Sequence, residues 1–174
     1  MYVYLPWYRR INAGSAGIAV NPGEIGSKGQ GGMLGERGQQ MSVFTVHLDN
    51  KPGQLAGLCE AMAGSDINLV LSATTRADEG TIVFVADDES AAEATLHETG
   101  LRYTMREALT IRLENEPGTG ALTFKRLADA GVNTDVLLPI RVSDELFFAV
   151  ICVDDESKAR QALGDQVVPA RLSP

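Results

Sequence analysis

The sequence predicts an α+β protein that consists of two similar βαββαβ units, because one stretch of the chain occurs twice. Residues 48–53 read LDNKPG, and residues 113–118, which lie 65 positions later, read LENEPG. Residues 87–90 (DDES) return as residues 154–157, a shift of 67 positions, so the second unit has two extra residues in one loop. A repeat of this length is too long for one turn of a solenoid and matches one small βαββαβ unit.

The first unit opens with a strand over residues 44–48, in which apolar and polar residues alternate. Asn50 and Pro52 stand where the N-cap and the first turn of a helix belong. The helix that follows has apolar residues at positions i, i+3, i+4 and i+7, and Gly64 ends it. The pattern then predicts strands at 67–74, 81–86 and 101–107, a turn at 76–80, and a helix that opens with a capping box at 90–93 and ends at Gly100.

The second unit repeats this order of elements. Only a residue or two around Ala108 join the units, which is too short for a flexible tether. We therefore expect the units, residues 41–107 and 108–174, to pack closely, either edge to edge or face to face. In each unit both helices would cover one face of a four-stranded antiparallel sheet and leave the other face open. The elements predicted in the second unit are strands at 109–113, 134–140, 146–153 and 166–168 and helices at 119–130 and 157–163.

Residues 1–40 differ from the rest of the chain, since they hold nine of the 18 glycines and show no sustained period of 2 or 3.6. We interpret them as a flexible N-terminal extension. Two hypotheses remain open. In one, Met41 is the true start, and residues 35–38 (GERG) are a translated ribosome-binding region, which mass spectrometry of the native N-terminus would test. In the other, the extension is real and docks on a partner through its aromatic residues, Tyr2, Tyr4, Trp7 and Tyr8.

Composition argues against several classes of protein. Residues 1–40 carry a net charge of +2 and the whole chain −8, so residues 41–174 carry −10 and would repel a nucleic acid backbone. No apolar stretch approaches the 18 residues of a membrane helix. Cys59 and Cys152 stand in apolar contexts and are typical of core residues in a reducing cytoplasm.

The sequence also predicts no metal site, no cofactor and no catalysis. Its two histidines, His47 and His97, are not accompanied by further ligands at zinc spacing. No dinucleotide, phosphate-loop or nucleophile-elbow motif occurs, and no acid, base and nucleophile converge. His47 alternates onto the open face of the first sheet, where it would contact a ligand or a partner or be a solvated surface residue.

The repeated turn is the best candidate for a binding site. Free N–H groups at residues 53–55 and the helix dipole favour a carboxylate there. Asn50 adds donors and an acceptor, and we expect Asn68, which opens the next strand, to reach the same end of the sheet. Asn115 and Asn133 repeat the pair 65 positions later. The alternative is that these asparagines only cap helices and form turns.

The two turns differ in charge. Lys51 stands in the first, whereas Glu114 and Glu116 stand in the second, so a carboxylate is favoured only at the first turn. If the turns meet across an interface, the first would hold the carboxylate of an amino acid and the second its ammonium group.

Both units resemble ACT domains, which are small modules that sense amino acids. The resemblance rests on residues 49–53 (DNKPG) with 66–68 (DIN) and on 114–118 (ENEPG) with 131–133 (GVN), and it covers residues 42 to about 168. The chain is similar to stand-alone tandem ACT proteins of bacteria, which have no catalytic domain.

The resemblance implies a ferredoxin-like fold for each unit, pairing of ACT units, and small effectors bound between paired units. Gly120 stands where the first unit has Leu55, which argues against a second, equal pocket. With Lys51 added from the charge pattern, the predicted ligand-binding residues are Asn50, Lys51, Pro52, Gly53, Gln54, Leu55, Asn68, Asn115, Gly118 and Asn133.

We therefore expect a cytoplasmic, non-catalytic regulatory protein that binds a free amino acid, with an apolar or neutral ligand suiting a site bordered by Leu55 and Leu69. Homodimerisation and a metabolic enzyme or transporter as partner are further expectations. The main alternative is a structural or interaction subunit with a vestigial pocket.

Overall fold

The computed structural model describes residues 2–4 and 41–169. The predictions made for residues 1–40 lie outside the described part, except that the backbone of strand β1 (Tyr2–Tyr4) is described and pairs antiparallel with strand β3 (Leu69–Arg76). No helix of the described residues is long and apolar enough to cross a membrane.

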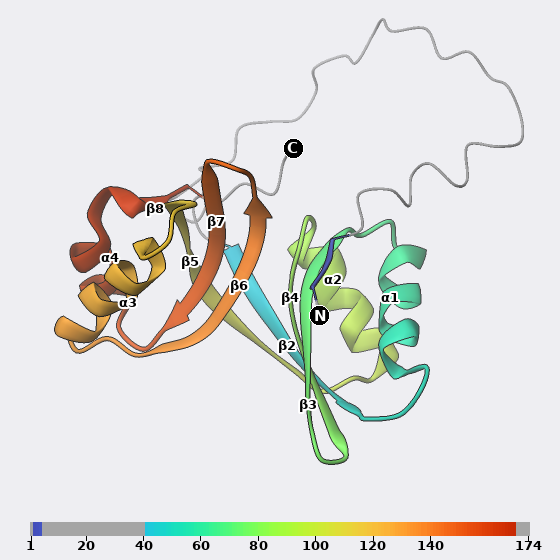
Figure 1. The fold of residues 1–174 in the computed structure, drawn as a ribbon. Helices are drawn as coiled ribbons and strands as arrows, with labels where there is room; N and C mark the ends of the chain where they lie inside the picture. The colour runs from blue at the N-terminus through green and yellow to red at the C-terminus, as the bar shows by residue number, and fades with distance from the viewer. Residues whose placement is uncertain (1, 5–40, 170–174) are drawn as a thin grey trace, which may run out of the picture.

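The first unit has the predicted order of elements (Figure 1). At the hairpin, the first strand ends at Arg76 and not at 74, and the second begins at Glu79 and not at 81, so the turn is only two residues long. The elements are β2 (Met41–Asp49), α1 (Gln54–Gly64), β3 (Leu69–Arg76), β4 (Glu79–Ala86), α2 (Glu89–Thr99) and β5 (Tyr103–Glu114).

The second unit shares β5 and then repeats the order, with a short 3-10 helix at Gly164–Gln166. Each unit has the antiparallel strand order of a ferredoxin-like fold, β3-β4-β2-β5 in the first and β6-β7-β5-β8 in the second, which confirms the predicted fold class. The remaining elements are α3 (Thr119–Asp129), β6 (Thr134–Val142), β7 (Leu146–Val153), α4 (Glu156–Leu163) and β8 (Val167–Val168).

Strand β5 joins the two units without a break. The sequence pattern predicted two strands separated around Ala108, but one strand of 12 residues runs through this position. Ala108 pairs with Met41 of β2, and the next residue, Leu109, pairs with Ile151 of β7. The predicted boundary thus falls where β5 changes partner, and the backbone pairing leaves no hinge there.

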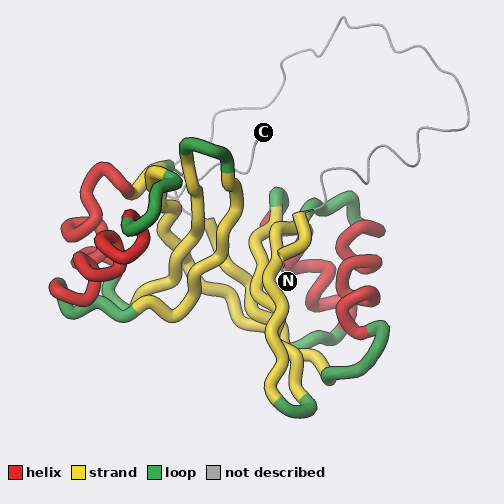
Figure 2. Tube along the Cα trace, in the orientation of Figure 1, coloured by secondary structure: helices red, strands yellow, loops and turns green. Residues whose placement is uncertain are grey.

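The helix-free faces of the two sheets pack against each other. One apolar cluster joins residues from both units without any helix residue, among them Val43, Val85, Leu138 and Val150, each at most 1% exposed. Each unit also has its own apolar core, which lies between its sheet and its helices. Figure 2 shows the helices at the two outer sides and the strands between them. The units therefore pack face to face and share β5 at one edge.

Two predicted helix starts are wrong. Helix α1 begins at Gln54, and its N-cap is Gly53 in the left-handed conformation (φ 91°), so Asn50 is not the cap. Helix α2 is capped by Asp88, whose Oδ1 accepts a hydrogen bond from the Ala91 amide at 2.9 Å. The N-cap thus lies two residues before Ser90, so the helix starts two residues earlier than a capping box at Ser90 would allow.

Candidate functional site

The duplicated asparagine anchors a hairpin turn in both units. Asn50 donates from its backbone amide to the Asp78 carbonyl at 2.8 Å and from its side-chain Nδ2 to the Ala77 carbonyl at 3.1 Å. Asn115 makes the same two hydrogen bonds in the second unit. Its backbone amide donates to the Glu145 carbonyl at 2.9 Å, and its Nδ2 donates to the Ser143 carbonyl at 2.6 Å. One side-chain N–H of each asparagine is thereby used, and it holds the turn between β3 and β4 or between β6 and β7.

Lys51 is engaged by its neighbour Asp49. The Lys51 Nζ lies 2.7 Å from the Asp49 carboxylate, and both side chains are well exposed. The hydrogen bond and the opposite charge lower the pKa of Asp49 and raise the pKa of Lys51. A ligand carboxylate at this turn would therefore meet a cation that already has a partner.

The remaining predicted residues of the turn shape the start of the helix. Gly53 and Gly118 both have positive φ angles, 91° and 98°, and no side chain among the described residues caps α1 or α3. The amide of Gln54, two residues after Pro52, donates to the Lys51 carbonyl at 3.3 Å. Leu55 is half-buried against the core of the first unit, which fixes the first turn of α1.

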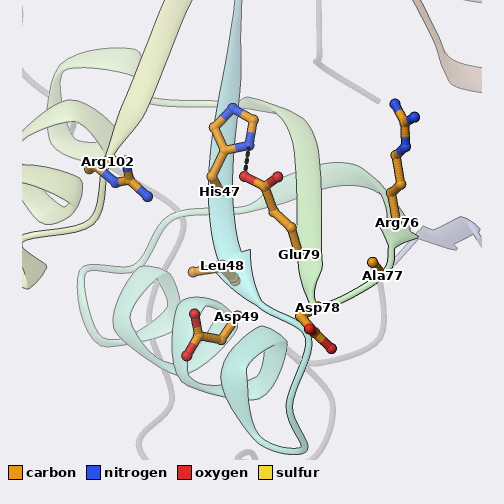
Figure 3. Close-up of a pocket in the computed structure, with 8 residues that line it drawn as sticks. All are labelled: His47, Leu48, Asp49, Arg76, Ala77, Asp78, Glu79 and Arg102. Atoms are coloured by element: carbon orange, nitrogen blue, oxygen red, sulfur yellow. Dashed lines mark ion pairs between the residues drawn. The ribbon is translucent and has the colours of Figure 1, made fainter.

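A polar pocket of about 420 Å³ lies beside this first turn (Figure 3). The end of β2, the β3–β4 turn and the residue before β5 form its walls. Figure 3 shows Arg76 and Arg102 on opposite sides, with Asp49 and Asp78 at one end. Such a mixture of cations and carboxylates suits a zwitterion. The lining residues are His47, Leu48, Asp49, Arg76, Ala77, Asp78, Glu79 and Arg102.

His47 pairs with Glu79 inside this pocket. Its Nδ1 lies 3.1 Å from the Glu79 Oε1, with the two side chains 39% and 62% exposed. The Nδ1 atom itself is buried and makes no regular hydrogen bond within the described residues. Sequence reasoning noted His47 but missed Arg76, Asp78, Glu79 and Arg102. The charged hairpin turn, residues 76–79 (RADE), was the available signal.

Asn68 lies at the opposite end of the first sheet from Asn50, so the prediction that both reach one end is wrong. Both β2 and β3 are antiparallel to β4, and they therefore run parallel to each other. The end of β2 then lies beside the end of β3, and Asn68 precedes the start of β3. Eight residues of strand separate these ends by about 26 Å. Asn68 donates to Asp87 through its amide and its Nδ2, both at 2.9 Å.

An apolar groove of about 160 Å³ borders Asn68. Burial raises the pKa of the Cys59 thiol in this groove, which keeps it protonated. Of the predicted neighbours of the ligand, Leu69 lies here, whereas Leu55 belongs to the core beside the first turn. The groove is lined by Cys59, Glu60, Met62, Ala63, Ile67, Asn68, Leu69 and Leu71.

The two duplicated turns do not meet within one chain. The first lies near the start of β5, since Val46 pairs with Tyr103 and the His47 amide bonds to the Arg102 carbonyl at 3.3 Å. The second follows Glu114 at the other end of β5. Twelve residues of strand place these turns about 40 Å apart. A ligand held between both turns would therefore need turns from different chains.

Asn133 joins a network that connects the two units. Its amide donates to the Asp154 Oδ1 at 2.9 Å and its Nδ2 to the Asp135 Oδ1 at 2.7 Å. The Asp135 Oδ2 accepts from Arg106 at 2.7 Å, and Arg106 also donates to the Val153 carbonyl at 3.1 Å. Neither Arg106 nor Asp135 was predicted, because no local motif marks a contact between units.

The fold and this site define a protein of two fused ferredoxin-like units with polar residues gathered at the strand-to-helix turns. No group of three metal-ligating side chains occurs among the described residues. The chain belongs to the ACT domain pair family, whose model matches residues 38–167. The resemblance seen in the sequence is thereby confirmed.

Solved structures share this fold. Protein BT0572 from Bacteroides thetaiotaomicron is 23% identical, with a TM-score of 0.67 over 75% of this chain and 91% of that one. The ligand-free regulatory subunit of aspartate kinase from Thermus thermophilus is 15% identical, with a TM-score of 0.55 over 74% and 93% of the two chains. At these identities the similarity establishes the fold alone. No curated protein matches the sequence.

Proposed function

We propose that this protein is a non-catalytic amino-acid sensor, and that the ligand binds at the first strand-to-helix turn. The observation that carries the proposal is the polar pocket beside Asn50. Its volume of about 420 Å³ falls in the range of small-molecule sites. Arg76 and Arg102 suit a carboxylate, and Asp78 and Glu79 suit an ammonium group.

The residues around this pocket differ from their counterparts in the second unit. Asp49 pairs with Glu79 across β2 and β4, and the corresponding pair in the second unit is Glu114 with Leu146. An apolar side chain thus stands where the first pocket has a carboxylate for an ammonium group. Together with Gly120 in place of Leu55, this difference supports one binding pocket for each chain.

A second copy of the chain would complete the site. The helix-free faces are already buried against each other, so a paired ACT unit that covers the first turn must come from outside the chain. In such a dimer, the turn of one copy could lie beside the Asn68 groove of the other, which would bring apolar residues to the ligand side chain. This arrangement favours a neutral or apolar amino acid and links binding to the arrangement of the copies.

Thermal-shift screening against the twenty amino acids tests the proposal. We expect a concentration-dependent rise in melting temperature with at least one neutral amino acid. Arg102→Ala should lose most of that rise. Arg141→Ala is the matched control, since Arg141 is an exposed arginine near the hairpin turn of the second unit, and it should keep the rise. No shift with any amino acid up to millimolar concentration would overturn the sensor proposal.

Lys51→Glu separates the two ways in which the turn could receive the ligand. The substitution places a second carboxylate beside Asp49 and removes the cation. If the ligand carboxylate approaches this turn, calorimetry should give a clearly weaker affinity. An unchanged affinity would instead assign the carboxylate to the arginines of the pocket.

The competing function, an interaction subunit with a vestigial pocket, is favoured by one observation. Asn50 and Asn115 each donate one side-chain N–H to a hairpin carbonyl, so the duplicated asparagines already have a structural role. A chain that forms stable dimers without any response to amino acids would support this alternative.

A further inference from the structure

An asparagine precedes the second strand of each unit, and its side-chain amide has a different hydrogen-bond partner in the two units. In the first unit, Asp87 accepts hydrogen bonds from both the backbone amide and the side-chain Nδ2 of Asn68. In the second unit, Asp154 accepts a hydrogen bond only from the backbone amide of Asn133, and the Nδ2 of Asn133 donates to Asp135. Repeat spacing aligns Asp135 with Val70, which packs in the first unit against the core between the sheets. The carboxylate of Asp135 therefore gives the side-chain amide of Asn133 a partner that Asn68 does not have.

Asp135 also makes a polar contact with the first unit. Its second oxygen accepts from Arg106 Nη1 at 2.7 Å. Arg106 stands in the half of β5 that pairs with β2, opposite Val43, and therefore belongs to the first unit. Its Nη2 reaches the Val153 carbonyl at the end of β7 at 3.1 Å. One guanidinium of the first unit thus holds both β6 and β7 of the second.

We propose that Asp135 is a positioning residue that orients the Asn133 amide and, through Arg106, couples it to the packing of the two units. Asp135 divides its two oxygens between Asn133 and Arg106, so a movement of the sheets that draws Arg106 away also frees the amide. The reverse holds by linkage: a ligand that favours one arrangement of the two units also changes how Asp135 holds the Asn133 amide. That second statement rests on the proposed function.

Charge and exposure are consistent with a coupling role. Arg106 and Asp135 are 45% and 37% exposed, so the pair by itself adds little to the free energy of folding. The hydrogen bond to Asp135 raises the pKa of Arg106, which keeps the guanidinium charged. An exposed pair that spans two units and also holds an asparagine is suited to orient that asparagine, because either oxygen of Asp135 can be released at modest cost.

The first test uses the ligand-free protein. Arg106→Lys keeps the positive charge but cannot reach Asp135 and the Val153 carbonyl together. In ¹H–¹⁵N spectra, we expect this variant to shift the side-chain amide signals of Asn133, which Arg106 does not bond directly, and to leave those of Asn68 in place. Asp87→Asn is the matched control, since it should move the Asn68 signals and leave those of Asn133 unchanged. Unmoved Asn133 signals in Arg106→Lys would overturn the positioning role.

The second test uses whichever amino acid the thermal screen identifies. Arg106→Lys should change its affinity between about twofold and thirtyfold, the range expected when a coupling contact is lost. Asp135→Asn combined with Arg106→Lys should bind no more weakly than Asp135→Asn alone, because the two residues act in one chain of contacts. Additive losses would contradict the coupling. If no amino acid binds the wild-type protein, the proposed function fails, and the spectra alone decide the positioning role.

Discussion

The side-chain amide of Asn50 and the carbonyl of Ala77 are joined by a hydrogen bond of 3.1 Å, and this bond ties the first strand-to-helix turn to the hairpin that forms the polar pocket. Asn115 and Ser143 make the corresponding bond in the second unit, at 2.6 Å. The duplicated asparagine therefore has a structural role in both units, and in the first unit it bonds to Ala77, which lines the candidate binding site.

Asn50→Ala and Asn115→Ala should each lower the free energy of unfolding by about 1 kcal/mol, because each removes one hydrogen bond to a backbone carbonyl. Urea unfolding of both variants measures this. In addition, only Asn50→Ala should weaken the response to amino acids, since only the first hairpin borders the polar pocket. An Asn50→Ala protein of unchanged stability would argue that the hairpin does not depend on this bond.

Two glycines, Gly53 at the N-cap of α1 and Gly57 inside the helix, provide a matched pair of substitutions. Gly53 has a φ angle of 91°, in the left-handed region that disfavours other residues, whereas Gly57 lies inside the helix, and a Cβ at either position meets nothing within 4 Å. Gly53→Ala should therefore cost about 1 kcal/mol of stability. Gly57→Ala should increase stability by about 0.5–1 kcal/mol, as expected for an alanine inside a helix. Thermal unfolding of the two variants checks the opposite signs.

Two buried threonines should respond in opposite ways to replacement by valine. Thr110 is 4% exposed, and its hydroxyl has no hydrogen-bond partner in the part of the chain that the structure describes. Thr110→Val removes this unsatisfied group and should raise stability by about 1 kcal/mol.

Thr123 is the control for that substitution, since it is 1% exposed and its hydroxyl donates to the Thr119 carbonyl at 3.0 Å and accepts from Gln166 at 3.2 Å. Thr123→Val should lower stability by about 1 kcal/mol or more, because it leaves Gln166 without this acceptor. Equal effects of the two substitutions in urea unfolding would show that the hydroxyl of Thr110 is satisfied in solution.

Asp155 gives the fold an acid-sensitive cap. Its carboxylate accepts from the Lys158 amide at 3.0 Å, and this bond, helped by the Lys158 ammonium, lowers its pKa from the usual 3.8. A carboxyl with a lowered pKa in the folded state stabilises it fully above pH 3.8, and this contribution is lost as the pH falls through the lower, folded value.

Asp155→Asn retains a good capping residue but cannot titrate. The melting temperature of the variant should therefore fall less steeply between pH 4 and pH 2 than that of the wild type. Identical slopes for the two proteins would mean that the carboxylate of Asp155 does not contribute to the acid sensitivity.

The sequence alone determined much of the fold, because the relevant signals are local. Alternating side chains in β2 and the 3.6-residue period of α1 are set by neighbours in the chain, and the repeat of LDNKPG as LENEPG showed that the order of elements occurs twice. The turn around Asn50 was also located correctly, although its asparagine bonds to the hairpin and does not cap the helix.

Only the tertiary structure decided which ends of these elements meet. Asn50 and Asn68 look adjacent in a motif, yet the parallel course of β2 and β3 places them at opposite ends of a sheet. The continuous course of β5 separates the two duplicated turns, and Arg106 meets Asp135 because the helix-free faces close on each other. Pairing between distant strands sets these relationships, and side-chain periodicity along one strand carries no information about the strand that lies opposite.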